Sequence, residues 1–70
     1  LSYKEQRELQ TLPERIATLE REQAEVEGQL ADGSLYTSDP ARAAQLATRL
    51  TDIEAEWFEA MERLESLSNG

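Results

Sequence analysis

The chain has 70 residues, of which 15 are acidic and 7 are basic, giving a formal net charge of -8 at pH 7. This length allows one small domain with a thin core, and the acidic excess excludes the uniformly basic surface of a general nucleic-acid-binding protein. Cysteine and histidine are both absent, which excludes disulfides, thiol nucleophiles and zinc sites built from those residues. Neither a signal peptide nor an apolar run of about 18 residues occurs, so we expect no membrane partner.

Residues 3–31 carry the pattern of an amphipathic helix. Apolar side chains recur at alternating spacings of three and four residues, which places them on one side of a helix and is typical of coiled coils. This first seam consists of Leu9, Leu12, Ile16, Leu19, Gln23, Val26 and Leu30. Gln23 is its one polar residue, which we interpret as setting the helix register. Ser2 and Glu5 have the spacing of a capping box, which predicts that the helix begins near residue 3.

Pro13 interrupts this pattern. In a continuous helix its ring clashes with the carbonyl group of Leu9, four residues earlier. Thr11 and Glu14 also have the spacing of a second capping box, which would begin a new helix at this point. We therefore predict a kink or a break near Pro13.

Residues 32–39 are rich in turn-forming side chains, which predicts a reversal of chain direction. Gly33 can adopt the left-handed conformation that ends a helix. Asp39 followed by Pro40 is typical of an N-cap and a first helical residue, so the second helix is expected over about residues 40–67. Its seam has the same alternating spacing and consists of Ala43, Leu46, Leu50, Ile53, Trp57, Ala60, Leu64 and Leu67.

A short connection between two amphipathic helices makes them antiparallel neighbours. The sequence therefore predicts an all-α fold, a two-helix antiparallel coiled-coil hairpin that occupies residues 1–70 as a single unit. Because the first residue is leucine rather than methionine, we expect the chain to be a fragment of a larger protein.

Charged residues beside the two seams favour one register of this hairpin. That register places opposite charges, or a charge and an amide, face to face in four pairs: Glu8 with Arg63, Arg15 with Glu56, Glu22 with Arg49, and Gln29 with Arg42. A shift of one heptad would instead oppose Arg15 to Arg63 and Glu22 to Glu56. Because exposed ion pairs are weak, they select the register while the apolar seams supply the stability.

Acidic pairs such as Glu22 and Glu25 recur along both helices, but no histidine or nucleophile accompanies them. We therefore predict no catalytic residue and no metal site. Phe58 and Met61 lie beside the second seam, where they either cover a flank of the hairpin or form a patch for protein interaction.

The basic residues also allow two interpretations. They either neutralise glutamates of the hairpin or contact the phosphates of a nucleic acid. The candidate nucleic-acid-binding residues are Lys4, Arg7, Arg15, Arg21, Arg42, Arg49 and Arg63.

Several short stretches resemble those of a known family. They are Leu1-Ser2-Tyr3-Lys4-Glu5-Gln6-Arg7-Glu8-Leu9, Leu12-Pro13 with Ile16 and Leu19-Glu20, Leu35-Tyr36, and Asp39-Pro40. In these stretches the chain resembles the C-terminal coiled-coil domain of ABC-F type ATP-binding cassette ATPases of the Uup type. The resemblance implies a bacterial, cytoplasmic parent protein with two ATPase cassettes, which bind ATP and magnesium, while the fragment itself binds no cofactor. It also implies a role in DNA binding and, for the wider ABC-F group, functions linked to the ribosome.

Two functional hypotheses follow. In the first, this non-catalytic domain helps its parent to bind DNA or another structured nucleic acid through the seven basic residues. In the second, it is a protein-interaction module without nucleic-acid binding, which forms a homodimer or docks on its own ATPase cassettes or on the ribosome. The net charge of -8 and the Phe58–Met61 patch support the second hypothesis.

Overall fold

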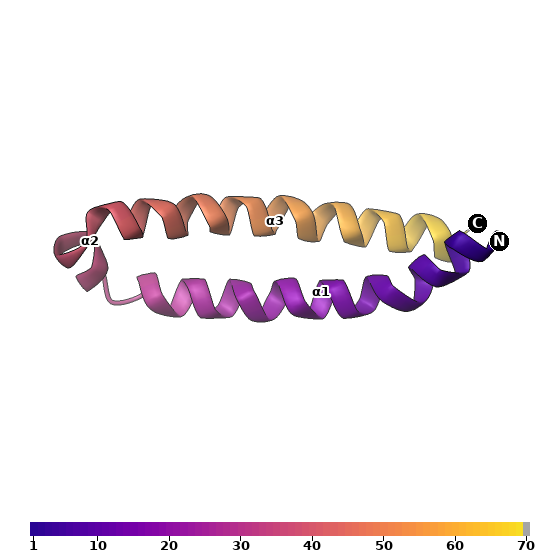
Figure 1. Ribbon diagram of the computed structural model, residues 1–70, viewed down its shortest axis with the longest axis horizontal. Helices are drawn as coiled ribbons and strands as arrows, with labels where there is room; N and C mark the ends of the chain where they lie inside the picture. The colour runs from indigo at the N-terminus through magenta and orange to yellow at the C-terminus, as the bar shows by residue number, and fades with distance from the viewer. Residues whose placement is uncertain (70) are drawn as a thin grey trace.

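The computed structural model describes residues 1–69 and contains three helices (Figure 1). They are α1 at Tyr3–Leu30, α2 at Ser34–Ser38 and α3 at Pro40–Asn69. Residues 1–69 contain no strand, which confirms the all-helical class. The predicted bounds of the long helices are nearly correct: α1 ends at Leu30 instead of residue 31, and α3 ends at Asn69 instead of residue 67.

The two long helices lie side by side with opposite chain directions (Figure 1). Glu8 near the start of α1 contacts Arg63 near the end of α3, whereas Glu22 contacts Arg49, closer to α2. The molecule is a rod of 51 × 16 × 14 Å. The start of α1 and the end of α3 therefore share one end of the rod, and α2 lies at the other.

The core is a single layer of apolar side chains between α1 and α3. Every position of both predicted seams is buried or half-buried. The innermost cluster consists of Leu19, Val26, Leu46 and Ile53, and Ile53 is fully buried. No polar or charged residue among residues 1–69 is buried. Removal of these seams from water is therefore the main favourable contribution to folding.

The predicted caps are confirmed. The Glu5 backbone N–H donates to Ser2 Oγ, and the Ser2 N–H donates to Glu5 Oε1, each at 3.1 Å. Gly33 has a φ of 75° and donates its N–H to the Leu30 carbonyl group at 3.3 Å. At the start of α3 the Asp39 carboxylate accepts the Arg42 N–H at 3.1 Å. Each cap satisfies a backbone group that the helix end leaves without a partner.

The connection contains a short helix that the turn composition did not predict. The Asp32 carboxylate accepts both the N–H and the hydroxyl of Ser34, each at 2.9 Å, and α2 begins there. Leu35 is half-buried and packs against the innermost cluster. This apolar contact anchors α2 over the end of the core, which explains why the segment forms a short helix instead of an open turn.

Of the two alternatives predicted near Pro13, the break is wrong, because α1 continues through that residue. Its first turns are inclined to the rest of the helix, as a kink requires (Figure 1). The Thr11 hydroxyl donates to the Glu8 carbonyl group at 3.4 Å, an arrangement found inside helices rather than at a new cap. Because Leu9, Leu12 and Ile16 belong to the packed seam on both sides of the proline, tertiary packing keeps the helix intact.

The two prolines provide a matched test. Pro13→Ala is expected to raise the free energy of unfolding by about 1–3 kcal/mol, because it restores a backbone donor and removes the ring clash. Pro40→Ala is expected to change it by less than about 1 kcal/mol, because proline suits the first helical position. Urea unfolding followed by circular dichroism measures both values. A loss of stability in Pro13→Ala would contradict the account of the bend.

Candidate functional site

Ion pairs join α1 and α3 along one flank of the hairpin. Arg63 binds Glu8 through Nε and Nη2 at 2.7 and 3.0 Å, and Arg49 binds Glu22 through the same atoms at 2.6 and 2.7 Å. Such two-point contacts fix the geometry of both side chains. We call this side the ion-pair flank, formed by Glu8, Arg15, Glu22, Arg49, Glu56 and Arg63.

Glu56 links two arginines on this flank. It accepts from Arg15 Nη2 at 3.2 Å and from Arg49 Nη1 at 3.0 Å. The three ion pairs predicted from the charge pattern are therefore present. The fourth predicted contact, between Gln29 and Arg42, forms no hydrogen bond within residues 1–69.

These contacts shift the titration of the paired groups. Hydrogen bonds from Arg49 lower the pKa of the Glu22 carboxyl group, and hydrogen bonds from Arg63 do the same for Glu8. The reciprocal effect raises the pKa of both guanidinium groups. All four groups are therefore charged at neutral pH, and the charge of these arginines is locally compensated.

The remaining basic residues form no such ion pair within residues 1–69, although the charge of Lys4 helps to lower the pKa of the Glu8 carboxyl group. Arg15, Arg49 and Arg63 are bound by glutamates, so only part of the predicted set is free for phosphates. The basic residues without an ion pair in residues 1–69 are Lys4, Arg7, Arg21 and Arg42. Arg21 Nη2 donates to Thr18 Oγ1 at 3.3 Å, a neutral contact that leaves its charge available.

An exposed tyrosine accompanies two of these residues at the start of α1. Tyr3 is 76% exposed, and Arg7 Nη1 donates to its hydroxyl at 3.5 Å. The hollow beside it is polar and is lined by Tyr3, Gln6, Arg7, Gln10 and Thr11. We call Tyr3, Lys4 and Arg7 the tyrosine cluster. Sequence reasoning did not single out Tyr3, although its place beside Lys4 and one turn before Arg7 was an available signal.

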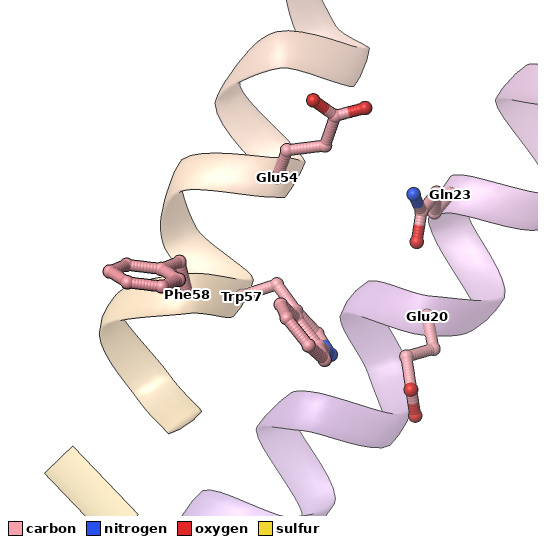
Figure 2. A pocket seen from close by; sticks show the side chains of 5 residues that line it. All are labelled: Glu20, Gln23, Glu54, Trp57 and Phe58. Atoms are coloured by element: carbon pink, nitrogen blue, oxygen red, sulfur yellow. The ribbon is translucent and has the colours of Figure 1, made fainter. Parts of the chain in front are cut away.

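The opposite flank carries aromatic side chains and carboxylates (Figure 2). A hollow there is lined by Glu20 and Gln23 of α1 and by Glu54, Trp57 and Phe58 of α3. Trp57 points towards α1, whereas Phe58 points away from it (Figure 2). The Trp57 indole packs against the innermost cluster, and its Nε1 is buried without a hydrogen-bond partner in the described chain.

A second hollow continues this surface along α3. It is lined by Trp57, Phe58, Met61, Glu62, Leu64, Glu65 and Ser68. Phe58 is 59% exposed and Met61 is 39% exposed, so these residues do not cover the core. Both side chains therefore lie exposed on the surface of α3.

Two further properties concern the same described residues. No three of their histidine, cysteine, aspartate or glutamate side chains are placed to hold a metal ion together. None of their helices is both long enough and apolar enough to cross a membrane.

Comparison with known proteins supplies the family. The family model described as the ABC transporter C-terminal domain matches residues 1–69. The chain belongs to this family. It is similar to the ATP-binding protein Uup of Escherichia coli (strain K12), with 36% identity over 73 residues. That alignment covers 100% of this chain and 12% of the relative, so the chain spans about an eighth of that protein's length. No solved structure matches the chain significantly.

Some of the residues that carried the sequence resemblance lie at the helix ends of this ABC transporter C-terminal domain, whereas Leu9, Leu12, Ile16 and Leu19 lie in the seam of α1. Ser2 and Glu5 form the first cap, while Asp39 and Pro40 begin α3. Leu35 anchors the short helix between them. The motifs that carried the resemblance therefore contribute both to the helix ends and to the packed core.

The ion-pair flank predicts a specific pH dependence. The pKa of Glu22 lies below the usual 4.5 in the folded chain, so the folded state binds fewer protons than the unfolded state below that pH. Stability is therefore fully present above pH 4.5 and falls as the pH drops through the lowered value. Glu22→Gln should flatten this fall, whereas Glu25→Gln, which removes an exposed carboxylate without an ion pair, should not.

Urea unfolding of the wild type and both variants across an acidic pH series measures the effect. Equal pH profiles for Glu22→Gln and the wild type would contradict a stabilising role for the pair between Glu22 and Arg49.

Proposed function

We propose that this chain is a non-catalytic antiparallel coiled-coil domain through which an ATP-binding parent protein contacts DNA or another structured nucleic acid. The family assignment and the name of the similar protein support an ATP-binding parent. In line with the ABC-F resemblance, the cassettes of a bacterial, cytoplasmic parent would bind ATP and magnesium and perform the hydrolysis.

The observation that carries this proposal is the location of the basic residues without an ion pair within residues 1–69. Two of the four, Lys4 and Arg7, belong to the tyrosine cluster at the start of α1. Neither residue forms an ion pair with the nearby carboxylates, because Glu8 binds Arg63 and Glu5, which stays charged, accepts the Ser2 N–H in the helix cap. Positive charge at this end of the rod is therefore available to a phosphate, despite the net acidity of the chain.

Tyr3 adds a second kind of contact. An exposed aromatic ring beside basic side chains provides a surface on which an unpaired base can stack. This combination favours nucleic acids that expose bases, such as branched or partly single-stranded DNA, over a continuous duplex.

Arg21 extends the same surface along the rod. It occupies the heptad position of Arg7, and the two lie 14 residues apart, so both are on the outer side of α1 about 21 Å from each other. Arg42 lies near the far end, at the start of α3. A nucleic acid that follows the outer side of α1 would meet Arg7 and then Arg21, with Glu14 at the same heptad position between them.

A matched pair of single substitutions tests this proposal. Arg7→Gln should weaken binding of the chain to branched DNA and reduce the slope of log affinity against log salt by about 1. Arg15→Gln removes an arginine that Glu56 already binds, and Arg49 still donates a hydrogen bond to that glutamate, so the slope should stay unchanged. Titration at low and moderate salt with branched and duplex DNA provides the measurement. Absence of binding at millimolar protein, or binding that ignores salt, would contradict the proposal.

The exposed aromatic residues favour a second candidate function, protein–protein contact. Phe58 and Met61 expose apolar area that the hairpin does not use. The partner would be a second copy of the chain, the ATPase cassettes of the parent or the ribosome.

Sedimentation equilibrium of the wild type and Phe58→Ser separates these partners. A homodimer through this surface predicts a dimer mass for the wild type and a monomer mass for the variant. A monomer mass for both would exclude the homodimer and retain the cassettes or the ribosome as the partner.

A further inference from the structure

We propose that the apolar surface on α3 docks a cationic amphipathic segment of a partner protein, in which apolar anchors are flanked by lysine or arginine. This inference rests on the second candidate function and is independent of nucleic-acid binding. It specifies the chemistry of the partner from the apolar area, the charges around it and their arrangement.

The apolar part is continuous. Trp57 and Phe58 line both hollows of this flank, so the two hollows form one groove. Met61 and Leu64 continue the groove along α3 at the spacing of successive helical turns. We call Trp57, Phe58, Met61 and Leu64 the apolar groove. Its length along one helix suits the apolar stripe of a second helix.

The border of the apolar groove is acidic. The carboxylates that line its two hollows are Glu20, Glu54, Glu62 and Glu65. None of the four makes an ion pair within residues 1–69, and neither hollow is lined by lysine or arginine. The glutamates of the ion-pair flank, in contrast, are each bound by an arginine. The two sides of the hairpin therefore differ in charge compensation.

This charge distribution indicates which kind of partner can bind in the apolar groove. A second copy packed on the same surface would bring its own glutamates against Glu54, Glu62 and Glu65, and a nucleic acid would bring phosphates against them. A cationic amphipathic segment would place apolar side chains on Phe58 and Met61 and its basic residues on the acidic border. Of the three occupants, it alone satisfies both features of the surface.

The experiment uses Trp57 as a local reporter, because it is the single tryptophan of the chain and lines the apolar groove. The probe is a synthetic amphipathic helix with a leucine and phenylalanine stripe flanked by lysine and arginine. Titration into the 70-residue chain should give a saturable change in tryptophan emission. Phe58→Ser/Met61→Ser should abolish saturation, with circular dichroism checking that the variant remains helical.

Two triple variants of equal net charge separate attraction by the carboxylates beside the groove from attraction by the net charge of the whole chain. Glu54→Gln/Glu62→Gln/Glu65→Gln removes part of the acidic border and should weaken binding roughly tenfold. Glu14→Gln/Glu25→Gln/Asp52→Asn removes exposed carboxylates that do not line the groove, and should weaken it less than about twofold. Equal losses in the two variants would overturn the proposal, because the attraction would then come from the net charge alone.

A second peptide, in which glutamate replaces lysine and arginine, distinguishes protein docking in general from a preference for a cationic segment. Failure of this peptide, with binding of the first, supports the proposal. Equal binding of both would retain protein docking as a function and overturn its cationic specificity. Absence of binding by both, or a wild-type dimer that Phe58→Ser dissociates, would overturn the cationic partner as the occupant of the groove.

Discussion

The hairpin depends on one apolar layer between two antiparallel helices. A lone helix of this length has few favourable contacts beyond its own hydrogen bonds, and each long helix here buries its seam mainly against the other, with Leu35 of α2 packed at the end of the layer. The layer also determines which residues are available for function. Once the seams face each other, every other side chain is assigned to the ion-pair flank, the opposite flank or the outer surface of a helix.

Much of this arrangement could be predicted because its causes are local or periodic. The seams follow from heptad spacing, the caps from short motifs, and the three ion pairs from charges that repeat at the seam edges. The failures have a different cause. The helix persists through Pro13, and Leu35 anchors α2, because of packing between segments distant in sequence. Rules based on local sequence, such as those for proline and for turns, do not take that packing energy into account.

The candidate functional surfaces, like the fold, could be predicted from the sequence only in part. The charge pattern indicated the ion pairs of Arg15, Arg49 and Arg63 but left the arginines with two possible roles. The structure places these three against glutamates and leaves the other basic residues without an ion pair within residues 1–69. Phe58 and Met61 could be recognised from the sequence because they lie just outside the seam, where a helix gives them no partner. The tyrosine cluster had a weaker signal, since a single exposed aromatic residue at a helix start resembles many other surface residues until the contact with Arg7 is seen.

The placement of both helix ends at one end of the rod has a mechanical consequence. A body joined to the start of α1 would hold the hairpin by its base, and α2 would project by nearly the full 51 Å. A small rotation at the base then becomes a large displacement at α2, provided that the rod does not bend. The cross-links of the ion-pair flank and the continuous core favour that stiffness. The domain thus has the form of a lever, with the tyrosine cluster near the fulcrum and α2 at the moving end.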